Sequence, residues 1–449
     1  MREEIFISHF SSLISNYIIM NKIHLPEEKD WNHLLQRPVF NAEELYGKVN
    51  AIISSVKERK DKALLDYAAQ FDGVQLDSLI VSEEEFQTAI ASVSQDLKNA
   101  IVQAKKNIEL FHSKQKEHIT KVETMPGVTC WRKSVAIDKV GLYIPGGSAP
   151  LFSTILMLGV PAAIAGCREI VLCTPPDKAG NIHPAILYTA SLLGIKKVIK
   201  AGGAQAIAAM TFGTESVPAV YKIFGPGNQY VTAAKQLVTQ YGVAIDMPAG
   251  PSEVAVIADA NADAELIAAD LLSQAEHGGD SQVIFITPVE ALLAKVEQAI
   301  EQQLKALPRA AIALKAIENS KLIWVNSMDE AFAMSNAYAP EHLILHLDNA
   351  ETWGEKVINA GSVFLGAWTP ESAGDYASGT NHTLPTNGYA RAYSGVSLDS
   401  FIKKITFQHI SKEGLKNVGP VVEIMAENEQ LHAHKNAVTL RLKKIENRK

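Results

Sequence analysis

Residues 140–175 read VGLYIPGGSAPLFSTILMLGVPAAIAGCREIVLCTP, and no charged side chain occurs from Val140 to Cys167. An uncharged stretch of this length resembles a membrane span. Three prolines and the pair Gly146–Gly147 interrupt it, so a buried strand, a glycine-rich turn and a buried helix explain it better. The run EIVLCTP then predicts a second buried strand. The stretch therefore predicts one unit of a strand–helix–strand fold.

The same alternation continues along the chain. Helical stretches at about 152–165, 184–194, 204–212 and 228–240 follow the strand-like runs VGLYIP, EIVLCTP, KKVIKAGG and YKIFGPG. Strands and helices then alternate again through EVAVIAD, SQVIFITP, KLIWVN, HLILHL and GSVFLG. Such alternation is typical of parallel sheets covered by helices. We therefore expect an α/β fold of two adjacent, incomplete Rossmann-like units with mainly parallel sheets and a cleft between them.

The flanking regions follow other patterns. Residues 42–71 and 82–115 carry apolar residues at three- and four-residue spacing, which predicts a helical N-terminal region. Ser82 precedes three glutamates and is expected to cap a helix. A β-rich connector, VTCWRKSVAIDKVGLYIP, precedes the first unit. After about residue 397 the pattern changes to KKITFQHI and two short helices, which we interpret as a tail rather than a domain.

Composition narrows the class of partner. The 449 residues are 47% hydrophobic and 20% charged, with 42 basic and 49 acidic residues and a net charge of −7. No basic block stands out, which argues against a nucleic-acid partner and favours a small polar substrate. The N-terminal residues MREEIFISHF lack the features of a secretory signal, and the three cysteines form no CxxC pair. We expect a cytoplasmic protein with no membrane segment.

Four glycine-rich turns follow predicted strands: IPGGSAP, KAGGAQA, FGPGNQY and MPAGPSE. Turns of this kind let backbone amides approach a phosphate or a cofactor closely. None spells G-x-G-x-x-G, because Tyr230 stands where the third glycine would be. Taken alone, the turns leave open whether they bind a dinucleotide or only connect strands to helices.

Polar side chains suggest a metal site. Gln274 and His277, in LLSQAEHGGDSQ (271–282), are three positions apart and share a helix face. Asp270 lies one turn earlier on that face, so spacing alone does not choose the ligands. The alternative is a helix C-terminus at which the histidine interacts with the helix dipole.

Further candidates are dispersed through three other motifs. These are Glu341 and His342 in APEHLILHL, Asp375 and His382 in ESAGDYASGTNHTLPT, and Glu429, His432 and His434 in NEQLHAHKN. A glutamine, an aspartate and two histidines would make a tetrahedral zinc set. Adjacent residues of an extended strand point to opposite sides, which argues against Glu341 and His342 as a pair. At the entrance of a strand, both could still reach a cleft.

Together these strings resemble histidinol dehydrogenases. VGLYIPGG, FGPGNQYVTAAK, DMPAGPSEV, DLLSQAEHG, APEHL, SAGDYASGTNHTLPT and HKNAVTLR occur in that order, and the similarity extends from FDG at residue 71 to AHKNAVTLR at 433–441. The resemblance implies a homodimer with one Zn²⁺ per subunit. It also implies NAD-dependent oxidation of L-histidinol through L-histidinaldehyde to L-histidine with two NAD, the last two steps of histidine biosynthesis.

The resemblance also implies a role for individual residues. Zinc ligands fall on Gln274, His277, Asp375 and His434, and the acid–base pair falls on Glu341 and His342. NAD contacts fall on Tyr143, Gln205 and Asn228. Besides His342 and the zinc ligands, substrate contacts fall on Ser252, His382 and Glu429. His432 receives no role, and we expect it to be structural.

These roles imply a division of the chain. We expect an N-terminal extension (1–37), a substrate and zinc α/β domain (38–142 with 251–396), an NAD-binding α/β domain (143–250) and a dimerisation tail (397–449). The tail is expected to cross to the other subunit and complete its site with Glu429 and His434.

Three alternatives remain open from the residues themselves. A cysteine nucleophile could oxidise the aldehyde, but Cys130, Cys167 and Cys173 all lie in or beside predicted strands, where structural cysteines are expected. A zinc hydrolase could use the same ligands but has no use for Tyr143, Gln205 and Asn228. A noncatalytic imidazole-binding protein would need the zinc but not Glu341.

Overall fold

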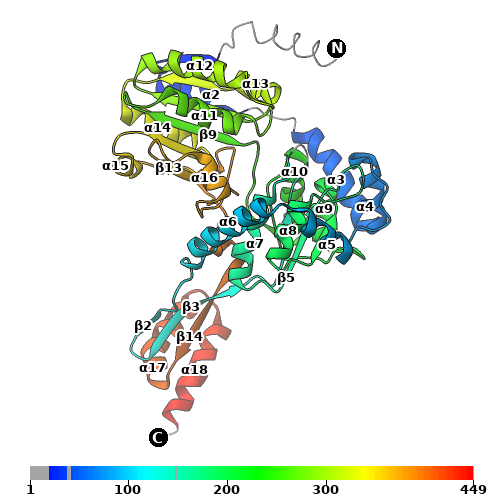
Figure 1. The fold of residues 1–449 in the computed structure, drawn as a ribbon. Helices are drawn as coiled ribbons and strands as arrows, with labels where there is room; N and C mark the ends of the chain where they lie inside the picture. Colours follow the sequence, from blue (N-terminus) through cyan, green and yellow to red (C-terminus); the bar gives the residue numbers. More distant parts are fainter. Residues whose placement is uncertain (1–19, 38–41, 147–148, 448–449) are drawn as a thin grey trace.

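The computed structural model describes residues 20–37, 42–146 and 149–447, which form three parts (Figure 1). Two are α/β units, one built on a six-stranded sheet and one on a five-stranded sheet. The third contains a three-stranded sheet and two C-terminal helices. Residues 1–19 of the expected extension, and residues 147–148 of the first glycine turn, lie outside the described residues. No helix in the described ranges is long and apolar enough to cross a bilayer.

The five-stranded sheet has the order β6-β5-β4-β7-β8, and all its strands are parallel. Its strands are β4 (Lys139–Tyr143), β5 (Glu169–Thr174), β6 (Lys197–Lys200), β7 (Lys222–Phe224) and β8 (Ala244–Ile245). The expected helices are confirmed as α7 (Phe152–Ala165), α8 (Pro184–Leu192), α9 (Gly203–Phe212) and α10 (Gln229–Val238), followed by η3 (Thr239–Tyr241). Two apolar clusters on this unit form its core, as expected for a parallel sheet buried on both faces.

The six-stranded sheet has the order β1-β11-β10-β9-β12-β13 and is also parallel throughout. Its strands are β1 (Asn21–His24), β9 (Glu253–Ala258), β10 (Gln282–Thr287), β11 (Lys321–Trp324), β12 (His342–His346) and β13 (Ser362–Leu365). Its main helices are α11 (Ala264–Ala275), α12 (Glu290–Leu304), α13 (Ala310–Glu318) and α14 (Met328–Tyr338). Shorter elements are η1 (Glu28–Asp30), α2 (Trp31–Leu34), α15 (Ala350–Gly354), α16 (Glu371–Tyr376) and η4 (Tyr389–Arg391). The expected pair of parallel α/β units is confirmed.

The N-terminal helices pack on a different unit from the one we expected. They are α3 (Ala42–Arg59), α4 (Asp61–Tyr67), η2 (Ala68–Asp72), α5 (Glu83–Ser92) and α6 (Gln95–Ser113). Val49 and Ile53 of α3 share a core with Ile207 of α9, and Ile108 of α6 packs with Met157 of α7. Most of 38–142 therefore belongs with the five-stranded sheet, because its apolar faces fit the helices there.

Two further segments pair with strands outside the parts in which we expected them. Strand β1, inside the expected N-terminal extension, pairs with β11 at the edge of the six-stranded sheet. The tail shares its sheet with the β-rich connector. Strand β14 (Ile402–Ile410) pairs antiparallel with β3 (Val128–Ala136), which pairs with β2 (Lys121–Met125). These pairings join segments far apart in the sequence, which local patterns do not reveal.

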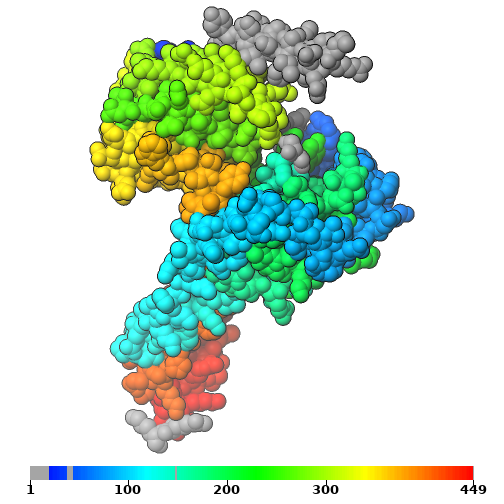
Figure 2. Space-filling view, viewed as in Figure 1, coloured from blue at the N-terminus to red at the C-terminus, as the bar shows by residue number. Residues whose placement is uncertain are grey.

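The third part projects away from both α/β units (Figures 1 and 2). After η5 (Leu398–Phe401) and β14, the chain forms α17 (Lys412–Asn428) and α18 (His432–Glu446), which pack against each other and are longer than expected. Several large apolar side chains of this pair stay exposed, including Ile424 (65%), Met425 (59%) and Leu440 (51%). Exposed apolar side chains gathered on one part are typical of a surface that another partner covers.

Candidate active site

Two cavities lie side by side at the glycine turns. The smaller, of ≈ 550 Å³, is lined by Ser252, His277, Glu341 and His382 from the six-stranded unit and the loops beside it. The larger, of ≈ 1290 Å³, is lined by Gln205 and by side chains from α3 and η2. Tyr143 and Asn228 line both. A ligand in the larger cavity can therefore reach the smaller one past these two residues.

The glycine turns hold Tyr143 at the boundary between the cavities. The Tyr143 hydroxyl accepts a hydrogen bond from the Gly203 N–H at 3.0 Å, which joins the first turn to the second. Gly225 of the third turn has φ +133°, and a Cβ there would overlap the carbonyl oxygen of Tyr143. Only glycine allows this close approach. The turn residues are therefore needed for the shape of the cavities, and not only for the connections.

Asn228 has a structural role in addition to any ligand contact. Its side-chain oxygen accepts hydrogen bonds from the N–H groups of Tyr230 (3.1 Å) and Val231 (3.2 Å), so that it caps α10. The cap uses only the oxygen. The two amide protons of Asn228 remain available to a ligand in either cavity.

Gln274 lies at the end of α11 and presents an unpartnered oxygen. Its Nε2 contacts the carbonyl oxygen of Glu253 (3.1 Å), Oε2 of Glu341 (3.3 Å) and Nδ1 of His342 (3.2 Å). These contacts fix the orientation of the amide. Its Oε1 is buried and has no hydrogen-bond partner. A buried amide oxygen without a donor among the described residues fits a ligand to a cation.

Glu341 and His342 meet although they are adjacent in the sequence. Glu341 lies just before β12, and its Oε2 is 3.8 Å from Nδ1 of His342, the first residue of that strand. Burial raises the pKa of Glu341 to about 8. Burial would lower the pKa of His342, but Glu371, Glu341 and Asp375 raise it to about 10. The pairing that the extended geometry argued against is therefore present at the strand entrance.

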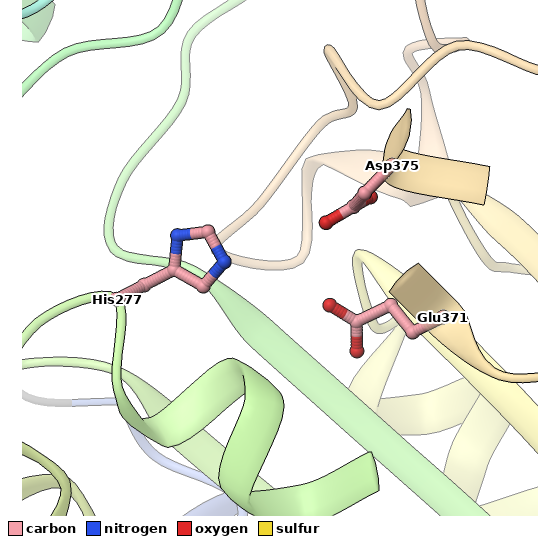
Figure 3. A group of neighbouring side chains, drawn as sticks. All are labelled: His277, Glu371 and Asp375. Atoms are coloured by element: carbon pink, nitrogen blue, oxygen red, sulfur yellow. The ribbon is translucent and has the colours of Figure 1, made fainter. Parts of the chain in front are cut away.

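Glu371 is a site residue that the sequence analysis missed. It is buried (1% exposed) on α16, and its Oε1 is 3.9 Å from Nδ1 of His342. Figure 3 shows Glu371, Asp375 and His277 pointing toward one another. Their ligand atoms lie within 4.8 Å of one another. The i, i+4 spacing of Glu371 and Asp375 in ESAGD is the signal that could have identified it.

Two buried oxygens at this place, Oε1 of Gln274 and Oε2 of Glu371, have no hydrogen-bond partner among the described residues. Nε2 of His342 is 3.5 Å from Oδ1 of Asp375. Three carboxyl groups, from Glu341, Glu371 and Asp375, surround the imidazole of His342, and burial raises the pKa of Glu341 and of Glu371. The buried oxygen and nitrogen atoms of this cluster fit a divalent cation, which would stabilise the ionised carboxylates.

His382 is held by two protein groups. Its Nδ1 donates to the carbonyl oxygen of Asp375 (2.8 Å), which leaves Nε2 as an acceptor for the Thr154 hydroxyl (3.0 Å). Burial lowers the pKa of His382. The ring is therefore neutral and links the loop after α16 to α7 of the other unit.

Two predicted site residues lie elsewhere. Glu429, at the C-terminal end of α17, and His434, on α18, are exposed on the projecting part, and neither lines the two cavities. His432 lies beside them, 3.9 Å from Glu427. Within one chain, the structure therefore brings together Gln274, His277 and Asp375 but not His434.

No cysteine in the described ranges lines either cavity. Cys173 is fully buried in β5, and burial raises its pKa and that of Cys167 to about 12. A thiol with a raised pKa supplies little thiolate at neutral pH. This supports the structural interpretation of Cys167 and Cys173.

Comparisons with known proteins identify the family of the chain. A family model for histidinol dehydrogenase matches residues 35–442. Histidinol dehydrogenase of Bacteroides thetaiotaomicron is 65% identical over 424 residues, which cover 94% of this chain and 99% of that protein. The chloroplastic histidinol dehydrogenase of Arabidopsis thaliana is 53% identical over 416 residues, or 92% of this chain and 89% of that protein.

A solved structure is similar over almost the whole fold. The crystal structure of histidinol dehydrogenase from Elizabethkingia anophelis superposes with a TM-score of 0.93 at 58% identity, covering 95% of this chain and 99% of that one. The chain is therefore an enzyme of the oxidoreductase class. It belongs to the histidinol dehydrogenase family.

Proposed function

We propose that this enzyme oxidises L-histidinol through L-histidinaldehyde to L-histidine, with two NAD and one Zn²⁺ per subunit. The observation that carries the proposal is the junction of the two cavities at Tyr143 and Asn228. The smaller cavity is lined by His277 and Glu341, which border the cluster of buried oxygen donors, and the larger cavity is lined by the first two glycine turns. This is the arrangement that hydride transfer between a metal-held substrate and a dinucleotide requires.

Gln274, His277 and Asp375 would hold the zinc, with Glu371 as a further candidate ligand. The unpartnered oxygens of Gln274 and Glu371 support this assignment, as does the grouping of Asp375 with His277 and Glu371. Zinc would act as a Lewis acid that holds and polarises the substrate. Because an amide oxygen adds no charge, Gln274 would let the site remain electrophilic while Asp375 neutralises part of the cation.

NAD would occupy the larger cavity of the five-stranded unit and accept the hydride. Gln205, Tyr143 and Asn228 line this space. Asn228 would use its amide protons, because its oxygen caps α10. The five-stranded unit is thus the proposed cofactor domain, and the six-stranded unit is the proposed substrate and zinc domain.

His342 would take the proton of the alcohol. The surrounding carboxylates raise the pKa of His342, so a cation that neutralises them would lower it toward neutrality, where a base works well. Glu341 would take a proton from the water that adds to the aldehyde. Both hydrogen bonds of Glu341 go to Oε2, which leaves Oε1 for that water.

Substrate contacts are proposed for Ser252 and His382, which line the smaller cavity, and for Glu429 and His434 of a second subunit. The projecting part with its exposed apolar side chains supports a homodimer in which this part docks on the partner. His434 would then complete the zinc site from across the interface.

The test is an assay with purified enzyme, NAD and L-histidinol, followed at the absorbance of NADH. A dehydrogenase produces NADH, whereas a zinc hydrolase or an imidazole-binding protein does not. An enzyme that binds zinc and histidinol but forms no NADH would overturn the proposal.

A further inference from the structure

A buried ion pair between Arg37 and Glu253 adjoins the cluster of Gln274, Glu341 and His342. Nε of Arg37 is 2.5 Å from Oε1 of Glu253, and Nη2 is 2.8 Å from Oε2, so the pair is bidentate. The exposed fractions of the two side chains are 13% and 3%. The guanidinium also donates to the carbonyl oxygen of Tyr338 and lies 3.9 Å above the ring of that tyrosine. This geometry fixes the Glu253 side chain rather than merely neutralising it.

The peptide groups of Glu253 hold three residues of the proposed site. Its N–H donates to Oε2 of Glu341 at 2.9 Å. Its carbonyl oxygen accepts from Nε2 of Gln274 at 3.1 Å and lies 3.3 Å from Nδ1 of His342. A small rotation of this one residue would therefore displace a proposed base, a proposed zinc ligand and a proposed acid–base histidine together.

The segments that pass between the two α/β units also meet at Glu253. Arg37 is the last described residue before α3, which packs on the five-stranded unit. Residues 246–252 lead from β8 of one unit to β9 of the other. The loop after α16 supplies the N–H of Asn387, 2.7 Å from Oε1 of Glu253, and its Thr386 accepts from the Gly250 N–H. The Glu253 carboxylate therefore contacts Arg37 and Asn387, and so connects these segments to the residue that contacts Glu341, Gln274 and His342.

We propose that Glu253, clamped by Arg37, is a positioning residue that sets the geometry of Glu341, Gln274 and His342. This inference rests on the proposed function, since it concerns the same site. Burying a charge is costly unless it is paired, so the loss of either partner leaves the other uncompensated and shifts the Glu253 backbone. A misplacement of about 1 Å can slow a reaction about 100-fold.

The test compares Glu253→Gln, Arg37→Lys and a control, Glu85→Gln. The control removes the ion pair between Glu85 and Lys200, away from both cavities, while glutamine can keep the capping box with Ser82. For each enzyme, three quantities are measured: kcat for histidinaldehyde, KM for NAD, and the Kd of zinc by competition with a chromophoric chelator. Thermal unfolding monitors the fold.

We expect Glu253→Gln to lower kcat for the aldehyde by about 10- to 100-fold and to weaken zinc binding several-fold, because Glu341 and Gln274 both move. KM for NAD should change less than about 2-fold, since the predicted NAD contacts lie on the other unit. Arg37→Lys keeps the positive charge but loses the bidentate contact with Glu253. It should therefore lower kcat for the aldehyde and weaken zinc binding in the same way, but by smaller factors. Glu85→Gln should leave all three quantities unchanged.

The inference is overturned if Glu253→Gln keeps normal aldehyde kcat and zinc affinity. It is also overturned if kcat falls only in proportion to the folded fraction, as a purely structural role predicts. If Glu253→Gln does not fold, Arg37→Lys decides by the same criteria. A wild-type enzyme that forms no NADH would instead contradict the proposed function, while the zinc affinities would still test the positioning role.

Discussion

At the scale of single residues, the hydrogen bonds of Gln274 show which atom of its amide is the nitrogen and which is the oxygen. Its Nε2 contacts the Glu253 carbonyl oxygen, Oε2 of Glu341 and Nδ1 of His342, and its oxygen is buried without a donor among the described residues. Beside it, burial raises the pKa of Glu341 to about 8 while its Oε2 is held by Glu253. These two side chains differ in chemistry, and substitutions can separate their roles.

Glu341→Gln should slow aldehyde oxidation far more than alcohol oxidation. Glutamine keeps the shape and can still accept the Glu253 N–H, but it cannot take a proton. We expect a loss of about 100-fold or more in kcat for histidinaldehyde, and a much smaller loss for oxidation of histidinol to the aldehyde. Single-turnover measurements on each substrate separate the steps. A variant that oxidises the aldehyde at the normal rate would exclude Glu341 as the base.

Asp72 predicts a pH dependence of stability. Burial raises its pKa from 3.8 to about 6, so the folded state binds a proton that the unfolded state has lost. The resulting stabilisation is complete below pH 3.8 and is lost as the pH rises through about 6. Asp72→Asn should therefore stabilise the enzyme at pH 8, by on the order of 1 kcal/mol after allowance for its half-exposed position.

The difference should shrink at pH 5, and denaturant unfolding without NAD at the two pH values measures it. Asp77→Asn, the same substitution at an exposed site, is the control. Equal effects of Asp72→Asn at both pH values would contradict the assigned cause.

Much of this residue-level chemistry could be predicted, and some could not. Motif similarity pointed to Gln274, His277, Asp375, Glu341 and His342, and the structure brings all five together. Glu371 was missed because the interpretation of ESAGDYASG stopped at its aspartate. Arg37 lies 216 residues from Glu253, and nothing local in either segment indicates the pair.

At the scale of elements, the glycine turns decide how closely strands approach. Strand β7 ends at Phe224, and Gly225 directly after it lies against Tyr143, the last residue of β4, where only glycine fits. The alternating pattern predicted both strands and the turn. The pattern could not predict that Gly225, in the turn after β7, contacts Tyr143 at the end of the neighbouring strand β4.

Gly225→Ala should therefore impair NAD binding. A methyl group would push the turn away from Tyr143 and change the wall shared by the two cavities. We expect KM for NAD to rise by about 10-fold or more. Gly242→Ala is the matched control, since Gly242 also has positive φ (+84°) but a Cβ there meets nothing within 4 Å. If both substitutions raise KM equally, backbone strain rather than close approach is responsible.

At the scale of the whole molecule, the C-terminal part stands apart from the site it is expected to complete. Figure 2 shows it projecting from the α/β units, and His434 on α18 is exposed. The sequence predicted the change of pattern near residue 397. It did not predict that β14 pairs with β3, because that pairing joins residues more than 260 positions apart.

Mixing two inactive variants tests whether the site is shared. His277→Asn and His434→Asn are unfolded together and refolded as hybrid dimers. If the C-terminal part crosses to the partner, one site of each hybrid carries both substitutions and the other carries neither. When half of the dimers are hybrids, activity should therefore return to about a quarter of the wild-type value. If it folds back on its own chain, every site keeps one lesion. A mixture that stays inactive would rule out the crossed arrangement.

In the proposed function, one site uses zinc and NAD to oxidise an alcohol to an acid in two steps. The most direct test is the amount of NADH formed per L-histidinol consumed, before and after removal of metal with a chelator. We predict two NADH per histidinol, no NADH after chelation, and recovery when Zn²⁺ is added back. One NADH per histidinol with release of the aldehyde, or full activity of metal-free enzyme, would contradict this function.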